Sequence, residues 1–363
     1  MTAVDPIVWN WKSILALIFA VVGTIGNSIV IIVYARKRSS GRNGGRRTHR
    51  NATDAFILNL AFADLITSIC IIPRPKLSKV NQDLGGQIYC RVVNTDVILW
   101  VSIVASIFTL TLVSIERYLA IVYPIRYRTI FAGNRARLVL VLIWLVSLVL
   151  NSFNVYCVGI DPVKESCTAA YPSLAYQQFI GAGLFVVEYF IPMVIMIVTH
   201  VLAIRALRAH ARTLLSRNES PNSPAYSLLN TRRKVIEMLL TVVIIFIVCW
   251  SGDQVMFLAF NLGYAYPEYL ASDIYQAFFL LAFVNSCANP IIYTFKNQQF
   301  RRAVKGLFKR QSNRVNDVTK VRGIENGLSQ MSLINALFLN DIRATYPQLQ
   351  KPAAHVRQAA SVL

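Results

Sequence analysis

Charged residues are scarce in this chain. Asp, Glu, Lys and Arg make up 15% of its 363 residues, whereas hydrophobic residues make up 55%. A soluble domain has about 25% charged residues, so the composition argues against that class of protein. Acidic residues are the scarcest, 17 against 37 lysines and arginines, and the net charge is +20. The basic residues flank apolar runs and do not form one stripe, so we do not expect nucleic acid to be a partner.

Three further absences narrow the function. The apolar stretch that begins at Ser13 has no small-residue cleavage site and contains Asn27 at its centre, so we interpret it as a retained helix and not a signal peptide. No hydrolytic or redox constellation is present, so we do not expect an enzyme. The chain shows no internal duplication of the kind found in secondary transporters, and a transporter therefore remains only as an unfavoured alternative.

Long apolar runs, by contrast, are abundant. Each has about 20 or more residues, enough to cross a hydrocarbon core of about 30 Å as a helix. They lie near residues 13–35, 54–73, 92–115, 138–158, 179–204, 235–262 and 269–295. The sequence therefore predicts an all-α fold, a bundle of seven transmembrane helices.

The basic residues predict the orientation of this bundle. If the first end of the chain is outside the cell, 31 of the 37 lysines and arginines fall in inner loops and the tail. The positive-inside rule then places residues 1–12 outside as a short extracellular segment and the tail in the cytoplasm. The excess of positive charge at the inner surface fits anionic membrane lipids and an acidic partner.

An amphipathic helix is predicted after the seventh span. Residues 295–309 place Phe300, Val304, Leu307 and Phe308 on one face. We therefore assign 13–309 to the bundle with a short eighth helix, and 310–363 to a disordered cytoplasmic tail. The last residues, Ser361-Val362-Leu363, have the form of a PDZ-domain ligand, and serines and threonines of the tail are candidate phosphorylation sites for arrestin binding.

Polar residues inside the spans lie at a common depth. By helix rise, Asp64, Ser106 and Asn285 are about 15–18 Å from the inner ends of their helices. A carboxylate near the bilayer centre must be protonated, paired or metal-bound, and the spans place no basic residue at that depth. A hard cation with oxygen ligands is one solution. A protonated Asp64 in a hydrogen-bond network is the alternative.

Two motifs suggest a family. Asn289-Pro290-Ile291-Ile292-Tyr293 lies in the seventh apolar run, and Glu116-Arg117-Tyr118 ends the third. Together they resemble the rhodopsin-like (class A) G-protein-coupled receptors, over roughly residues 12–309. The stretches 233–239 and 56–60 are most similar to receptors for short neuropeptides, the galanin, allatostatin and neuropeptide FF-like groups.

The resemblance implies a sodium ion at the polar centre of the bundle. The family's ligands for this ion match Asp64, Ser106, Asn285, Ser286 and Asn289. Asn27 matches the residue of the first helix that braces them. The implied ion is allosteric and is bound in the inactive state.

The resemblance also implies roles in activation. In the Glu116-Arg117-Tyr118 motif, Arg117 leaves its partner Glu116 on activation and lines a cavity for the heterotrimeric G protein. Ile125 inserts into the same G protein. Other matching positions are Pro192, Trp250 (the toggle tryptophan), Asn289, Pro290 and Tyr293. Two positions depart from the family: Gly252 replaces a proline of helix six, and His200 replaces a tyrosine of helix five that bridges toward the one matched by Tyr293.

Receptors of this family carry a disulfide between the top of helix three and the second outer loop. Cys90 and Cys167 match it, and Cys157 is the alternative loop partner. Cys90 precedes Arg117 by 27 residues, two more than is usual in the family. We therefore expect an extra bend at the top of helix three.

The outer halves of the spans predict the ligand. Asp96, Glu188 and Asp253 are carboxylates without a basic residue nearby in the spans, so they favour a cationic ligand. The alternative is that one or two of them face lipid or another helix. Further candidate ligand-binding residues are Leu99, Gln178, Trp250, Gln254, Phe257, Tyr275 and Gln276.

Two ligand classes are disfavoured by the residues at single positions. Leu99 stands where amine receptors of the family have an aspartate, which argues against a biogenic amine. Phe283 stands where the light-sensing members have a lysine, so we expect no retinal. The sequence thus predicts a plasma-membrane receptor for a small cationic neuropeptide, with a biogenic amine or another small molecule as the alternative.

Overall fold

A computed structural model describes residues 4–40, 52–131, 134–218, 220, 222–265, 269, 272–296 and 300–306. The chain divides into two units, Met1–Ala303 and Val304–Leu363. The second unit is described only for residues 304–306. The predicted tail, 310–363, with its PDZ-like end, lies outside the described residues.

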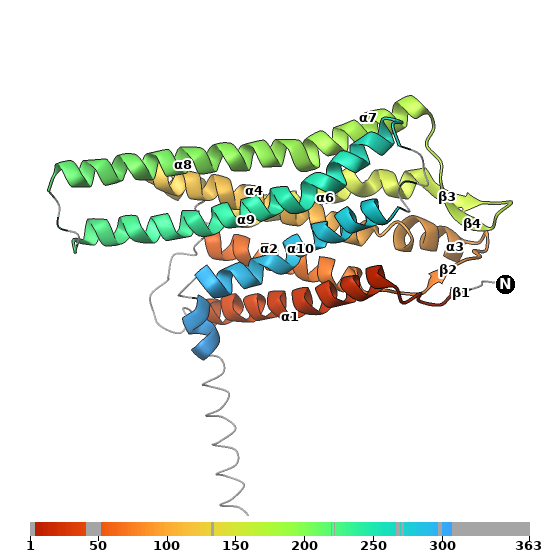
Figure 1. Ribbon diagram of the computed structural model, residues 1–363, viewed down its shortest axis with the longest axis horizontal. Coiled ribbons are helices and arrows are strands. Elements are labelled where there is room, and N and C mark those ends of the chain that lie inside the picture. The colour runs from red at the N-terminus through yellow and green to blue at the C-terminus, as the bar shows by residue number, and fades with distance from the viewer. Residues whose placement is uncertain are drawn as a thin grey trace, which may run out of the picture. The chain divides into compact units, whose positions relative to one another are not determined.

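Long apolar helices dominate the first unit, and seven of those in the described residues are long and apolar enough to cross a membrane (Figure 1). This confirms the predicted bundle. The spans are α1 (Trp11–Ser40), α2 (Ala52–Cys70), α3–η1–α4 (Leu84–Ile88, Tyr89–Val93, Val97–Val122), α6 (Arg135–Cys157), α7–η2–α8 (Leu174–Leu184, Phe185–Phe190, Ile191–Ser216), α9 (Pro224–Asn261) and α10 (Asp273–Lys296).

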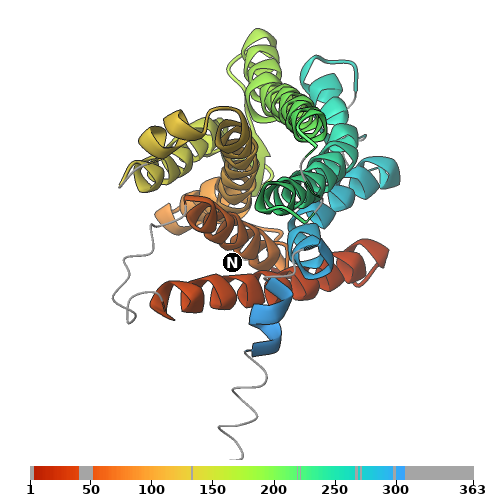
Figure 2. The same ribbon diagram turned by 90° about the vertical axis from the view of Figure 1, so that its left-hand side faces the viewer.

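The third span is the most buried of the seven. Its helix α4 packs against α2, α6, α8 and α9, and Figure 2, which looks along the bundle, shows the helices side by side. The short helix α5 (Pro124–Ile130) follows α4, with Pro124 at its first turn, where a missing N–H has no cost. The Glu116-Arg117-Tyr118 motif therefore lies at one end of a central, enclosed helix.

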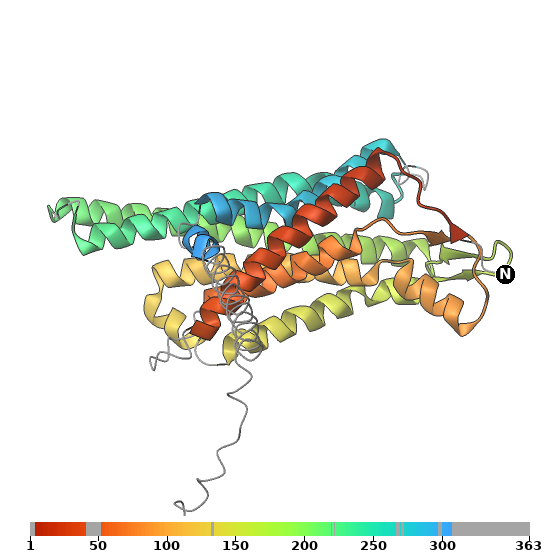
Figure 3. The same ribbon diagram turned by 90° about the horizontal axis from the view of Figure 1, so that it is seen from below.

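Two small antiparallel sheets lie at the end of the bundle near the N-terminus (Figure 1). In the first, β1 (Val4–Asp5) pairs with β2 (Lys76–Leu77). In the second, β3 (Val158–Asp161) pairs with β4 (Ser166–Ala169). We call this the outer end, following the orientation predicted from the sequence, and the opposite end, where α8 and α9 project, the inner end (Figure 3).

The third span is broken near its top, as the long Cys90–Arg117 spacing predicted. Tyr89–Val93 forms a π-helix, and α4 begins only at Val97. Between them Asp96 has a left-handed backbone, with φ at 54°. Aspartate tolerates this conformation better than most residues because its short polar side chain can hydrogen-bond locally. The two extra residues are thus accommodated by a local break.

The described part of the predicted eighth helix is helical, over residues 300–306. Phe300 is buried, and its ring stacks on Tyr34 of α1 and meets Tyr293 of α10 edge-on, with centroids 6.5 and 6.2 Å away. The apolar start of this helix is therefore anchored next to the last residue of the Asn289–Tyr293 motif. Residues 297–299 and 307–309 lie outside the described part of the chain.

Candidate functional site

A polar cluster occupies the middle of the bundle and is centred on Asp64 of α2. Ser106 Oγ of α4 donates to Asp64 Oδ1 at 2.7 Å, and Asn289 Nδ2 of α10 donates to Asp64 Oδ2 at 2.8 Å. Asp64 is fully buried. Three helices far apart in sequence thus place their polar residues around one carboxylate, as the equal depths predicted.

Oxygen atoms without partners surround this carboxylate. Asn285 and Asn289 are both buried, and their side-chain Oδ1 atoms accept no hydrogen bond within the described residues. Buried polar atoms are almost always satisfied by protein, water or an ion. Ser286 is also buried beside Asp64. Carboxylate, hydroxyl and amide oxygens form the kind of ligand set that a hard cation prefers.

Asn27 of α1 braces the cluster from the side. Its Nδ2 donates to the carbonyls of Gly23 and Ser286, each at 3.0 Å. The adjacent Gly26 permits a close approach, because a Cβ there would lie 2.9 Å from Pro290 Cβ. The freed backbone around the proline of α10 is therefore packed directly against α1.

The inner end of α4 carries the Glu116–Arg117 pair. Arg117 Nη2 donates to Glu116 Oε1 at 2.8 Å, and Thr53 Oγ1 of α2 donates to the same oxygen at 2.7 Å. Glu116 is fully buried, whereas Arg117 is partly exposed. Burial and the neighbouring Glu116 carboxylate raise the pKa of Tyr127 on α5. Arg117 is thus held by its ion pair with Glu116, an interaction that another carboxylate or acceptor could replace.

Two further residues of the inner end, Tyr118 and Ile125, have different surroundings. Tyr118 meets Tyr123 edge-on with ring centroids 6.0 Å apart. Ile125 on α5 is 84% exposed. The Ile125 side chain therefore packs little against the bundle and lies at the surface of the inner end.

The middle of α9 carries Trp250, which is buried and whose Nε1 has no hydrogen-bond acceptor among the described residues. Next to it, Gly252 lies against Phe278 of α10: a Cβ at Gly252 would be 2.1 Å from Phe278 Cδ1. The sequence suggested a helix-bending Ser-Gly pair. The structure shows that the glycine also allows α9 and α10 to pack closely.

Helix α8 carries the second departure from the family pattern. His200 is buried, and its Nδ1 lies 2.8 Å from the carbonyl of Met196 one turn earlier. Its Nε2 has no partner in the described part of the chain. Pro192, two turns before His200, is buried at the start of α8.

Of the three outer carboxylates, Asp96 requires a correction. We expected no basic partner, but Arg74, which follows α2, forms an ion pair with Asp96. Arg74 Nη2 also donates to the Val93 carbonyl at 2.7 Å. The guanidinium thus joins both sides of the break in the third span. Sequence reasoning missed Arg74 because 22 residues separate it from Asp96; its place between Pro73 and Pro75 was the only available signal.

Glu188 and Asp253 have different surroundings. Glu188, in the π-helix η2, lies toward α6, where Asn151 Nδ2 is 3.5 Å from its Oε1. This fits the alternative that one carboxylate makes a helix contact. Asp253 is 2% exposed; Gln254 Nε2 lies 3.2 Å from its Oδ2, and its Oδ1 has no partner within the described residues. Asp253 is therefore the outer carboxylate with unused capacity.

A group of aromatic side chains packs between α4 and α10. Tyr275 stacks on Phe279 of the same helix, and Phe279 in turn contacts Trp100 of α4, with centroids 6.4 and 6.0 Å apart. Gln178 Nε2 donates to the Leu262 carbonyl at 3.2 Å, so it joins α7 to the end of α9. Leu99 is buried on α4. Phe257 and Gln276 are partly buried, on α9 and α10.

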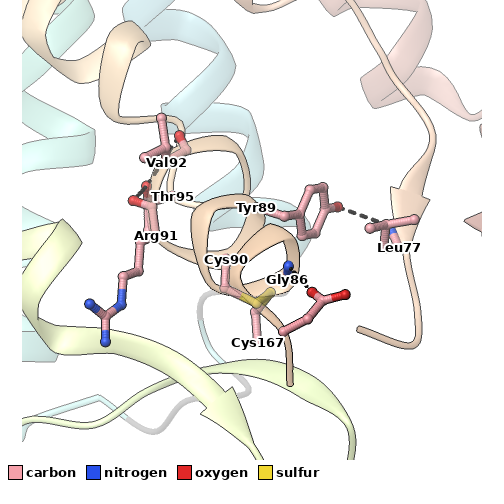
Figure 4. The surroundings of a disulfide bond; sticks show 9 residues. Leu77, Gly86, Tyr89, Cys90, Arg91, Val92, Thr95 and Cys167 are labelled. Carbon is pink, nitrogen blue, oxygen red and sulfur yellow. Dashed lines mark hydrogen bonds between the residues drawn. A yellow bond between two sulfur atoms is a disulfide. The ribbon is translucent and has the colours of Figure 1, made fainter. Parts of the chain in front are cut away.

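The disulfide joins Cys90 in η1 to Cys167 in β4, as the resemblance implied (Figure 4). Cys157, the alternative, is a buried free thiol. Next to the bond, the Leu77 amide of β2 donates to Tyr89 Oη at 2.9 Å. In the β3–β4 turn, the amides of Lys164 and Val163 donate to Asp161 and hold the pKa of that carboxyl below its usual value.

Comparison with known proteins agrees with these features. Residues 26–293 match the family described as 7 transmembrane receptor (rhodopsin family). Galanin receptor 2b of Danio rerio is 32% identical over 336 residues, covering 89% of this chain and 83% of that receptor. Galanin receptor 2a of the same species is 30% identical over 83% of this chain and 79% of its own length. Neuropeptide Y receptor type 6 of Mus musculus is 28% identical over 78% and 76%.

Proposed function

The chain belongs to the rhodopsin family of seven-transmembrane receptors and is a G-protein-coupled receptor. We propose that its ligand is a short, positively charged neuropeptide, which binds in the outer half of the bundle. The relatives named above are receptors for galanin and neuropeptide Y. The observation that carries the charge of the ligand is the buried Asp253, whose Oδ1 has no partner among the described residues. A buried carboxylate is costly unless a cation or hydrogen-bond donor compensates it.

The alternatives are less well supported. Asp96 is already neutralised by Arg74, so it gives little reason to expect a second cation at that position. A biogenic amine would need a carboxylate where this chain has the buried Leu99. Tyr275 packs with Phe279 and Trp100 and lies close enough to Asp253 to interact with its charge, which suits a ligand with both aromatic and basic side chains.

The test removes one charge from the peptide and one from the receptor, separately and together, and compares the losses in binding. Cells expressing the full chain are screened with short amidated peptides, and activation is read as G-protein dissociation. Each active peptide is then remade with citrulline in place of arginine. We expect the charged peptide to lose about 1–3 kcal/mol of binding when Asp253 is changed to Asn, and the citrulline peptide to lose much less.

Glu188→Gln is the matched control, because Glu188 is an outer carboxylate that lies against α6. It should leave the difference between the two peptides intact. If citrulline peptides are as potent as arginine peptides on the unmodified receptor, the ligand is not recognised by its charge and the proposal is wrong.

We further propose that a sodium ion binds at Asp64, with Ser106, Asn285, Ser286 and Asn289 as the other ligands. The fit rests on the two buried amide oxygens without partners beside the carboxylate. A bound cation supplies the positive charge that no described basic residue provides. Asn27 would hold α1 and α10 in register around the ion through its hydrogen bond to the Ser286 carbonyl of α10.

For coupling, we propose that Arg117 exchanges Glu116 for the heterotrimeric G protein, and that the exposed Ile125 contacts the same partner. The pair is charge-assisted and lies at the inner end, where the partly exposed Arg117 can be reached by another protein. Arrestin and a PDZ-domain protein are further candidate partners, whose sites lie in the tail beyond the described residues.

The chain is a multi-pass membrane protein. We propose that it resides in the plasma membrane with its N-terminus outside and its tail in the cytoplasm. The excess of basic residues on one side supports this orientation. The Cys90–Cys167 bond supports it as well, because disulfides form in oxidising compartments.

A further inference from the structure

A tyrosine and a serine join the fifth span to α9 in the middle of the bundle. Tyr189 Oη of η2 lies 2.5 Å from Ser251 Oγ of α9. Tyr189 is buried, and its ring contacts that of Phe246 on α9, with centroids 6.0 Å apart. Among the described residues, no other hydrogen bond joins a side chain of the α7–η2–α8 span to a side chain of α9. The two hydroxyl groups are thus a directional link between two neighbouring spans (Figure 1).

The direction of this hydrogen bond follows from a second one. Ser251 Oγ also lies 2.5 Å from the carbonyl of Ile247, one turn earlier in α9. A carbonyl can only accept, and a serine hydroxyl has a single hydrogen, so this hydrogen points to Ile247. The Tyr189 hydroxyl is therefore the donor to Ser251. Tyrosine, serine and carbonyl form a chain in which each hydrogen bond polarises the next.

This chain of hydrogen bonds acts on a part of α9 that bends easily. A serine that donates to the carbonyl four residues earlier tends to bend its helix. Gly252 follows Ser251 directly, at the position where the family pattern has a proline, and Ser-Gly pairs are common sites of helix kinks. A proline ring would enforce a bend permanently. The bend of α9 depends instead on hydrogen bonds, which can break.

The inner end of α9 is packed against its neighbours in this structure. Ile236 of α9 contacts Ile121 of α4 and Ala203 of α8. Arg117 remains paired with Glu116. We call this the closed arrangement. These contacts lie about 22 Å along the helix axis from the hydroxyl pair, so a change in bend of about 10° would move the inner end of α9 by about 4 Å.

We propose that Tyr189 is a positioning residue for signalling: by donating to Ser251 it fixes the bend of α9 and stabilises the closed arrangement. Opening of the inner end requires α9 to change its bend, and the buried hydrogen bond opposes that change. The π-helical turn of η2 fits this role, because one extra residue in a turn rotates the following side chains by about 100°. The proposal rests on G-protein coupling at the inner end and not on the identity of the ligand.

Ligand-independent G-protein activation tests the proposal, with no peptide added. The full chain is expressed at matched surface density, and dissociation of the heterotrimer is measured for each class of Gα subunit. Tyr189→Phe keeps the ring and removes only the hydroxyl, and Ser251→Ala removes its acceptor. Each should raise the signal by at least about 3-fold, the effect of one buried hydrogen bond. Because both variants lose the same bond, the double variant should rise no further than Ser251→Ala alone.

Two variants serve as controls. Ser251→Thr keeps a hydroxyl and should retain the signal of the parent. Ser147→Ala removes another buried serine, whose hydroxyl donates within the described residues only to the Ile143 carbonyl of its own helix, and it should change nothing. An unchanged signal in Tyr189→Phe, or an equal rise in Ser147→Ala, would overturn the proposal. If Ser251→Ala does not reach the surface, Tyr189→Phe and Ser251→Thr decide the result.

The coupling role of Arg117 is tested separately, by adding Arg117→Ala to Tyr189→Phe. Loss of the raised signal in this double variant would support both roles. A raised signal that persists would contradict the coupling role of Arg117 and would still support the positioning role of Tyr189.

Discussion

At the scale of single residues, the chain combines buried polar atoms that have partners with others that have none. Asp64 uses both carboxylate oxygens in hydrogen bonds, whereas Asn285 and Asn289 each leave an oxygen without one in the described residues. Polar groups buried without partners destabilise a fold by about 1–3 kcal/mol each. The two that lie beside Asp64 therefore indicate that a bound ion or water offsets this cost.

Asp64→Asn tests the proposed sodium site. A sodium ion that prefers the inactive state must lower agonist affinity as its concentration rises. Removing the carboxylate should abolish that dependence, which we expect to be about 5-fold or more in the parent. Agonist competition binding in sodium chloride and in choline chloride of equal ionic strength measures it. Asp273→Asn, which removes an exposed outer carboxylate paired with Lys12, should keep the dependence. Sodium sensitivity that survives in Asp64→Asn would contradict the site.

His200→Tyr tests the departure in α8. A tyrosine hydroxyl at this position can bridge toward Tyr293 in the active state, as the family pattern implies. Among the described residues, His200 hydrogen-bonds only to the Met196 carbonyl of its own helix. Basal signalling should therefore rise, by a coupling of roughly 0.5–2 kcal/mol. Ligand-independent G-protein activation at matched surface expression is the measurement. His200→Phe fills the same space without a hydroxyl, and an equal rise in that variant would show that size alone is responsible.

At the scale of elements, close helix approaches set the shape of the bundle. Gly252 lies where a Cβ would be 2.1 Å from Phe278, so α9 and α10 meet with no room for a side chain. Gly26 has the same relation to Pro290 between α1 and α10. Small residues at such crossings are the usual way in which membrane helices come close together.

Gly252→Ala should therefore destabilise the receptor by about 1–3 kcal/mol through overpacking. The midpoint of thermal unfolding of the purified receptor measures this. Gly183→Ala is the matched control, because a Cβ at Gly183 meets nothing within 4 Å, and its midpoint should not fall. Adding Phe278→Leu to Gly252→Ala should restore part of the loss. No coupling between the two positions would show that the glycine is needed for another reason, such as bending α9.

At the scale of the whole molecule, charge and covalent chemistry differ between the two ends of the bundle. The disulfide and both small sheets lie at one end, and the loops that join the spans at the other end contain more lysines and arginines. An epitope placed before Val4 should therefore be accessible to antibody on intact cells. An epitope after Leu363 should be accessible only after permeabilisation. The reverse pattern would overturn the proposed orientation.

Much of the fold could be predicted from the sequence, for local reasons. Long apolar runs specify membrane-crossing helices because an unsatisfied backbone is too costly in lipid. The break at the top of the third span followed from the two extra residues between Cys90 and Arg117. The depth of Asp64, Ser106 and Asn285 followed from the helix rise, because depth depends only on position along each helix.

The rotation of each helix about its axis, and thus its partners, was decided only by the tertiary structure. The sequence could not show that Arg74 neutralises Asp96 or that Glu188 lies toward Asn151. Nor could it show that one oxygen of Asp253 has no partner in the part of the chain that the structure describes. Those relations depend on contacts between segments distant in the chain, and one residue of rotation turns a side chain by about 100°. By itself the sequence determined how many spans there are, which residues form them and at what depth their polar groups lie. Packing decided which of those polar groups remain free to bind a ligand.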